Sequence, residues 1–311
     1  MPVEIKKKIS PDDISSLLTE HYSDSMKEFY EMQSGFLSSR YKIHKNIESS
    51  NILICFLRNV HLSIIRQREI NLDYNISLDS FLNNIHHIDL PTQKVISIVN
   101  TIGIPKETVR RKIKRLVQKG YLFSSKNKEY YWNLTAKRKD IFFDLMSNDI
   151  SIISKFVSNI TKYLNLNLTQ KTIEDEIKLQ FSFYFFHFLN CQLTWFKMWQ
   201  TKISDIDLIF IAMQALIPNL KYEDKMSNSS ISASSISEIS GIPRPTCIRK
   251  LEKLVKLGLL VREVKTKRYY VNQLTSDRPK HITKKENIVL TIQAFSNFLS
   301  ILISTLIRNE K

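Results

Sequence analysis

The chain has 311 residues, of which 43% are hydrophobic and 24% charged, proportions typical of a folded protein of one or two domains. Its formal net charge of +16 and isoelectric point near 9.6 favour a polyanionic partner, either nucleic acid or an anionic membrane surface. Cys55, Cys191 and Cys247 lie far apart without CxxC spacing, which excludes a disulfide framework and a zinc site. We expect reduced thiols in the core of a cytosolic protein.

The N-terminal part is predicted to be helical. Ser10-Pro11-Asp12-Asp13 combines a helix cap, a first-turn proline and acidic first-turn residues, and the preceding basic residues lack the apolar run of a signal peptide. His86 and His87 lie beside Asp89, but neighbouring residues point apart, so a loop or strand pair is expected rather than a metal site. Expected helices are 10–22, 25–46 (broken or bent around Gly35), 50–70 and a short one at 77–84.

A helix-turn-helix with a hairpin follows. Helices are expected at 92–101 and 105–119, separated by a turn at Gly103 and closed by a stop at Gly120. The second helix has Val109, Ile113, Leu116 and Val117 on one face, the spacing of a buried stripe. The short aromatic segments YLFSS and EYYWNL then form a hairpin with a basic tip, called a wing, before a helix at 139–164.

The second half repeats this plan. Without gaps, 103–123 and 241–261 share ten of 21 residues: Gly, Ile, Pro, Thr, Arg, Lys, Leu, Val, Gly and Leu. A second similarity joins 148–160 to 286–298 at the same offset of about 138 residues. The expected elements are helices 172–197 and 204–218, a polar loop 221–230, helices 233–240 and 243–257, a wing 259–274 and a helix 285–307.

The fold prediction is therefore mainly α with small β-hairpin wings. Two winged helix-turn-helix domains, 1–165 and 166–311, are related by internal duplication, with long helices at a pseudo-two-fold interface.

The positive charge concentrates on the second helix of each motif, the segment that reads the major groove in helix-turn-helix proteins. First-turn and exposed positions are best placed for bases, and Arg111 and Arg249 are the strongest candidates because Arg is bidentate to guanine. Thr108 and Thr246 contact DNA or stabilise the helix start. The base-facing set is Lys106, Thr108, Arg110, Arg111, Arg244, Thr246, Ile248 and Arg249. Phosphate neighbours or plain surface residues are Lys112, Lys114, Arg115, Lys250 and Lys253, and the wing-tip set is Lys126, Lys128, Lys265, Lys267 and Arg268.

The two copies differ where readout is expected. Arg110 in the first corresponds to Ile248 in the second, so one copy favours guanine or phosphate and the other a thymine methyl group. We therefore expect related but unequal half-sites.

Other functions have weaker support. No phosphate-binding glycine loop, HExxH or GxSxG motif occurs, so the chain is not expected to be an enzyme or to use a metal or cofactor.

The aromatic run from Phe181 to Trp199 indicates core or interface packing, with a ligand pocket beneath it left open. The stretch 287–307 has no charged residue over a membrane-span length, but its polar residues and its Lys-bearing counterpart favour a buried interface helix.

The segments GIPKETVRRKIKRLVQKGYL and GIPRPTCIRKLEKLVKLGLL, each followed by a hairpin ending in Leu-Thr, resemble winged-helix transcription regulators of the MarR and IclR families. The helix order is more similar to MarR proteins, in which a homodimer places two recognition helices in successive major grooves. The resemblance implies a fused, pseudo-symmetric dimer in one polypeptide. Two features depart from those families: the wings are shorter than in MarR proteins, and an IclR-type effector domain is missing.

The expected function is sequence-specific recognition of double-stranded DNA by a cytoplasmic, nucleoid-associated transcription regulator. It would act as a monomeric pseudo-dimer, with further homodimerisation and a small-molecule effector left open and no membrane partner. Tandem winged helices also occur in plasmid replication initiators, so a replication or partition initiator is an alternative. A protein-interaction scaffold that does not touch DNA is another.

Overall fold

The computed structural model describes residues 9–85, 90–132, 134–221, 229–272 and 285–309. Over these residues the protein is mainly helical, with two small antiparallel hairpins. The pair His86 and His87 and the end of the expected second wing lie outside the described residues.

The first half runs from an N-terminal helical pair to a hairpin and a long helix. α1 begins as the sequence predicts: Ser10 caps it by accepting from the backbone N–H of Asp13, and the Asp13 carboxylate accepts from the Ser10 N–H in return. The elements are α1 (Pro11–Glu20), α2 (Tyr22–His44), α3 (Ile47–Ile70), α4 (Leu78–Asn84), α5 (Val95–Ile102), α6 (Lys106–Gln118), β1 (Leu122–Ser124), β2 (Tyr130–Trp132), η2 (Ala136–Arg138), α7 (Lys139–Thr161) and η3 (Lys162–Leu164).

The second half follows a similar order. Its elements are α8 (Gln170–Leu179), α9 (Phe181–Ile203), α10 (Ile206–Lys221), α11 (Ala233–Ser240), α12 (Arg244–Lys256), β3 (Leu260–Arg262), β4 (Tyr269–Val271) and α14 (Lys285–Asn309). Several lengths coincide between the halves: 10 residues in α1 and α8, 23 in α2 and α9, 8 in α5 and α11, and 13 in α6 and α12.

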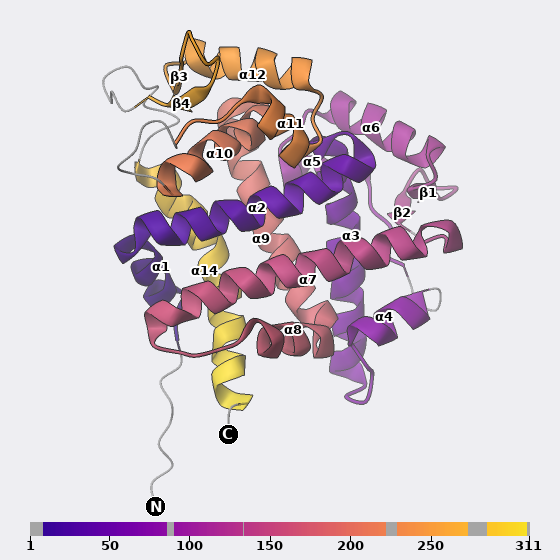
Figure 1. The fold of residues 1–311 in the computed structure, drawn as a ribbon. Helices are drawn as coiled ribbons and strands as arrows, with labels where there is room; N and C mark the ends of the chain where they lie inside the picture. Colours follow the sequence, from indigo (N-terminus) through magenta and orange to yellow (C-terminus); the bar gives the residue numbers. More distant parts are fainter. Residues whose placement is uncertain (1–8, 86–89, 133, 222–228, 273–284, 310–311) are drawn as a thin grey trace, which may run out of the picture.

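The long helices build a core that both halves share. In Figure 1, α3, α9 and α14 run from top to bottom, and α2 and α7 cross in front of them. α3 packs against α9, α1 against α14 and α2 against α10, so each half covers apolar surface of the other. The buried apolar residues of both halves form one continuous cluster.

A buried ion pair ties α2 to α7 in this core. The Arg40 guanidinium donates to both carboxylate oxygens of Asp149, at 2.9 and 2.6 Å, and the two side chains are 4% and 0% exposed. The same guanidinium lies over the Phe36 ring, 3.4 Å from its centroid. Because Arg40 and Asp149 are both removed from water, each depends on the other for its charge partner.

Helix breaks differ from the sequence prediction at two places. α2 continues through Gly35 without a break; the missing side chain there allows a close approach, since a Cβ atom would lie 3.3 Å from Ile152 of α7. The expected helix 172–197 is two helices, α8 and α9, separated at Gln180, whose φ of −109° and ψ of 39° are not helical. The aromatic run that suggested one apolar helix belongs to α9 alone.

The apolar C-terminal helix was also a predicted feature. Among the described residues, 289–308 of α14 is the one helical segment long and apolar enough to cross a membrane, and 56% of it is buried inside the protein. The pair α9 and α10 would qualify together, but the two helices are bent by 103°. α14 packs against α1 and α9, as expected for a core helix. All three cysteines are free and buried, as predicted.

Candidate nucleic-acid interface

Each half contains a short helix, a tight turn and a basic helix. α5 ends at Gly103 with φ of 70° and α11 at Gly241 with φ of 74°, the left-handed conformation that favours glycine. The next helices, α6 and α12, bury matching apolar rows that hold them to the protein: Val109, Ile113 and Leu116 in α6, and Cys247, Leu251 and Leu254 in α12. The opposite faces of α6 and α12 are therefore free to meet a partner.

A hairpin follows each basic helix. β1 pairs antiparallel with β2, and β3 with β4. An isolated bridge adds the segment before each short helix to its hairpin, Gln93 to Tyr130 in the first half and Ile231 to Tyr269 in the second. The hairpin, the short helix and the basic helix are thus fastened together as one unit in each half.

The exposed face of α6 is strongly basic. Arg111 is exposed, and no ion pair joins it to another described residue. Arg110 is paired with Glu107 at 3.1 Å, but both side chains are more than half exposed, so this pair is weak. Thr108 is half-buried. The exposed predicted contacts of this helix are Lys106, Arg110, Arg111, Lys114 and Arg115.

The exposed face of α12 carries fewer charges. Arg249 is exposed, like its counterpart Arg111, whereas Arg244 donates to the Ser234 hydroxyl at 3.0 Å. Ile248 is half-buried and packs against the core, which limits the area it offers to a ligand. Thr246 is half-buried, and Lys253 lies 3.4 Å from Asp205 with half of its side chain exposed.

Lys112 and Lys250 do not belong to the exposed faces on which the sequence placed them. The Lys112 ammonium donates to Asn46 at 2.7 Å and to Glu48 at 2.8 Å, and its side chain is 9% exposed. Lys250 donates to both oxygens of Asp205 at 2.6 Å. Both lysines point inward to the first turn of the preceding long helix, α3 or α10, and fix each basic helix on it.

The contact with Lys250 changes the pKa of Asp205. Burial raises the pKa of its carboxyl, but the hydrogen bonds and charge of Lys250 outweigh that effect and hold it below its usual value. Asp205 also accepts from the backbone N–H of Leu208, as the cap of α10. Asn46 caps α3 in the same way through Ser49. Sequence periodicity did not reveal these partners, because they come from helices far away in the chain.

The wing tips are only partly as predicted. Lys126, Lys128, Lys265 and Lys267 are exposed at the turns of the two hairpins. Arg268 instead donates to the Ser230 hydroxyl at 2.9 Å and to the Ser230 carbonyl at 2.7 Å. It anchors the second hairpin to the segment before α11.

Arg138 was not predicted to matter. Its guanidinium donates to the carbonyls of Lys119 and Gly120, at the C-terminal end of α6, and lies 3.8 Å from the centroid of the Tyr121 ring. A cation there neutralises the negative end of the helix dipole. A basic residue after the wing is too common a pattern to reveal this role from sequence.

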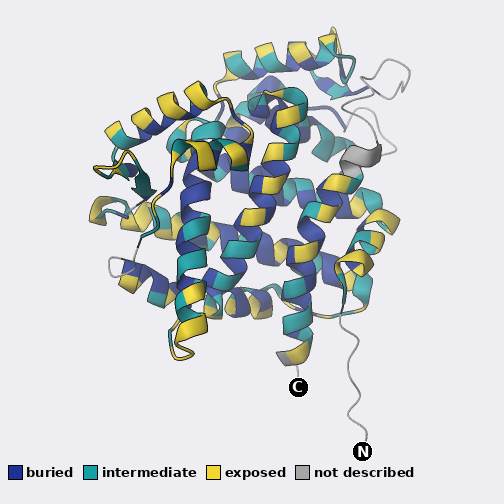
Figure 2. Cartoon of the chain, turned by 180° about the vertical axis from the view of Figure 1, so that it is seen from behind, coloured by how far each residue is buried: buried dark blue, intermediate teal, exposed yellow. Residues whose placement is uncertain are grey.

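The two basic helices lie at the same end of the molecule. In Figure 1, α6 and α12 occupy the top, and the hairpins lie at the outer right and outer left. Figure 2 shows exposed residues along the outer sides of these helices and buried residues toward the core. The structure therefore brings the two predicted basic faces onto one end of the protein.

Comparison of the chain with protein-family models, with curated proteins and with solved structures found no match. Among the described residues, no group of three or more His, Cys, Asp or Glu side chains is arranged to hold a metal ion.

Proposed function

We propose that this protein is a sequence-specific double-stranded-DNA-binding regulator that uses α6 and α12 as recognition helices. The observation that carries the proposal is the two exposed basic helix faces at one end of a single chain. α6 and α12 each follow a short helix and a turn, and a hairpin comes after each of them. This is the order of elements in a winged helix. The proposal extends to a nucleoid-associated location in the cytoplasm.

The equal helix lengths support an internal duplication. α1 and α8, α2 and α9, α5 and α11, and α6 and α12 match in length, and the left-handed glycine recurs at the same place in each turn. Lys112 and Lys250, which occupy equivalent positions, reach equivalent caps on α3 and α10. Contacts that recur in this way favour a duplicated unit over two unrelated segments.

The charge distribution favours DNA over a protein partner. A groove-reading helix needs cations near phosphates and donors near base edges. Neither α6 nor α12 has a side-chain hydrogen bond at its N-terminal cap, so the first backbone N–H groups are not occupied by a capping side chain. Arg111 and Arg249 occupy the same position in the middle of each 13-residue helix, are exposed, and are the base-contact candidates.

The halves are proposed to read unequal half-sites. Arg110 is exposed in α6, whereas Ile248 is half-buried in α12. Arg110 can therefore reach a base edge or phosphate that its counterpart cannot. The second half depends more on Arg249 and Arg244.

The test is binding to duplex DNA over a range of salt concentrations. Six to ten phosphate contacts would lower the affinity by about 10³- to 10⁵-fold between 50 and 200 mM salt. A protein-interaction scaffold would show no such binding. A replication or partition initiator would bind DNA equally but would support plasmid maintenance rather than change promoter activity, so a reporter assay separates it from a regulator.

A further inference from the structure

An apolar cavity lies beneath the second hairpin, among α2, α9 and α10. Its volume is about 230 Å³, larger than the roughly 150 Å³ engineered cavity that accommodates benzene. Among the described residues its lining is apolar apart from the hydroxyl groups of Tyr22, Tyr30 and Thr291, and none of these lining side chains is charged. Tyr22 and Tyr30 of α2 close one side, and Leu260 and Val271 of the hairpin close another.

Two hydrogen-bond donors in this lining have no partner among the described residues. The indole Nε1–H groups of Trp195 and Trp199 are buried and make no hydrogen bond within the described part of the chain. Trp195 is 1% exposed. A buried N–H without an acceptor costs free energy, so two of them in the lining of one cavity are a reason to look for an acceptor.

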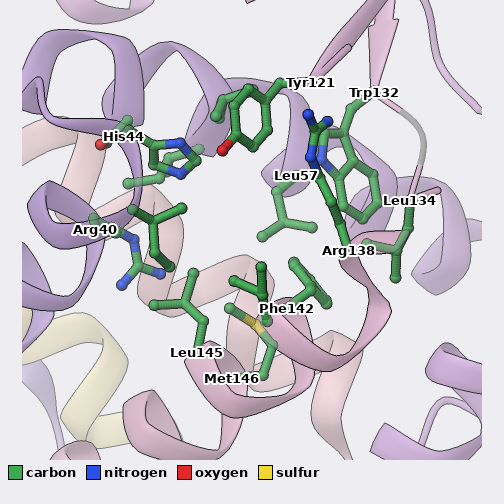
Figure 3. A pocket seen from close by; sticks show the side chains of 15 residues that line it. Arg40, His44, Leu57, Tyr121, Trp132, Leu134, Arg138, Phe142, Leu145 and Met146 are labelled. Atoms are coloured by element: carbon green, nitrogen blue, oxygen red, sulfur yellow. The ribbon is translucent and has the colours of Figure 1, made fainter. Parts of the chain in front are cut away.

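The corresponding cavity in the first half is smaller. The cavity there is about 80 Å³, and Figure 3 shows Tyr121, Trp132 and Arg138 gathered around it. In the second half Leu259 and Val271 stand where the first half has Tyr121 and Trp132. Smaller side chains in the second hairpin thus open a space that larger ones close in the first.

The helices that line the two cavities also differ in their side chains. Ala212 of α10 takes the place of Leu53 of α3, and Trp199 of α9 takes the place of Arg40 of α2. In the first half the Arg40 guanidinium is occupied by Asp149. In the second half, a neutral indole ring whose N–H has no partner among the described residues replaces that paired charge.

We propose that the cavity beneath the second hairpin binds one uncharged, ring-sized molecule whose acceptor oxygen receives the indole N–H of Trp195 or Trp199. A charged ligand would lose its hydration without gaining an opposite charge from the described residues that line the cavity, none of which is charged. The first half does not bind the same molecule, because its cavity is too small. This inference goes beyond DNA binding and does not depend on it.

The test uses three single-ring probes of similar size: acetophenone, ethylbenzene and benzoate. The chain has three tryptophans, so each indole N–H gives a separate nitrogen–proton NMR signal, assigned with single Trp→Phe variants. Acetophenone should shift the Trp195 and Trp199 signals and leave Trp132 unchanged. Ethylbenzene should bind more weakly and benzoate most weakly.

Trp199→Phe and Trp195→Phe keep most of the ring but remove the donor. At least one of them should weaken acetophenone binding by about 3- to 10-fold and leave ethylbenzene within about 2-fold of the wild-type value. Ala212→Leu should abolish binding of both neutral probes by filling the cavity, whereas the volume-conserving Met213→Leu should retain it. If Ala212→Leu does not fold, as judged by circular dichroism, the two Trp→Phe variants test the proposal without it.

Three results would overturn the proposal. One is that neither the Trp195 nor the Trp199 signal shifts with any probe up to about 10 mM, a concentration above the dissociation constant expected for a single-ring ligand. Another is an equal shift of Trp132, which would mean non-specific binding. The third is tighter binding of benzoate than of acetophenone, which would show that the ligand class is wrong.

Discussion

Neighbouring residues on α6 give the sharpest test of which face meets DNA. Arg111 is exposed and has no ion pair among the described residues, whereas Lys112 is buried against Asn46 and Glu48. Arg111→Ala and Lys112→Met both remove one positive charge from the same helix. If DNA were attracted only by the net charge of the protein, the two variants would lose the same affinity. A difference in their affinity therefore shows which face of α6 meets DNA.

The two variants should fail in different assays. Arg111→Ala removes a base contact worth about 1–3 kcal/mol, so affinity for the preferred duplex should fall roughly 5- to 150-fold. Its stability should stay within about 0.5 kcal/mol of wild type, as for other surface changes. Lys112→Met leaves the half-buried Glu48 carboxylate without its cation and removes one of the donors to Asn46, which keeps Ser49, so the free energy of unfolding should fall by about 1–3 kcal/mol.

Fluorescence anisotropy with labelled duplex at several salt concentrations measures the affinity, and urea denaturation followed by circular dichroism measures the stability. Lys112→Met should keep the wild-type slope of log affinity against log salt, because its ammonium does not reach phosphate. The reasoning is refuted if Lys112→Met reduces affinity and salt slope as much as Arg111→Ala while unfolding at the wild-type urea concentration.

Three further predictions follow from named contacts. Arg110→Ile, which copies Ile248 into the first half, should relax base preference at one half-site only in a selection from random DNA; equal loss at both would contradict unequal readout. Asp149→Ala should lower the free energy of unfolding by about 3–5 kcal/mol in urea denaturation, because it strands the buried Arg40 charge, and a loss under 1 kcal/mol would contradict a strong pair. Burial lowers the pKa of His61 to about 3, below its unfolded value near 6.5, so stability is full above pH 6.5 and falls as the pH drops toward 3. His61 alone should lower the free energy of unfolding by about 2 kcal/mol between pH 8 and pH 5. His61→Phe should remove that contribution and leave the one from His44, whose pKa burial also lowers to about 3, an outcome checked by urea denaturation at both pH values.

Local patterns in the sequence predicted the local structure well. The cap at Ser10, the apolar row of α6 and the turn at Gly103 depend on residues close together in the chain, and each occurs as expected. Helix breaks were less predictable. Gly35 is tolerated inside α2 because Ile152 of α7 approaches it closely, and that neighbour is more than a hundred residues away.

The sequence predicted only in part which cations of the two basic helices are exposed. Exposed cations such as Arg111 and Arg249 follow from helical periodicity, because one apolar row defines the opposite face. Lys112 and Lys250 sit at the edge of that row, where periodicity does not decide between solvent and an internal partner. Their partners, Glu48 and Asp205, are supplied by the tertiary packing of α3 and α10.

Selection of bound duplexes from random DNA tests the central claim most directly. Two recognition helices in one chain predict enriched sequences with two related but unequal half-sites, their centres about 10 base pairs apart or a multiple of that spacing. Enrichment of one isolated half-site would show that only one helix reads DNA. No enrichment above the starting pool would contradict the proposal that this protein is a sequence-specific DNA-binding protein.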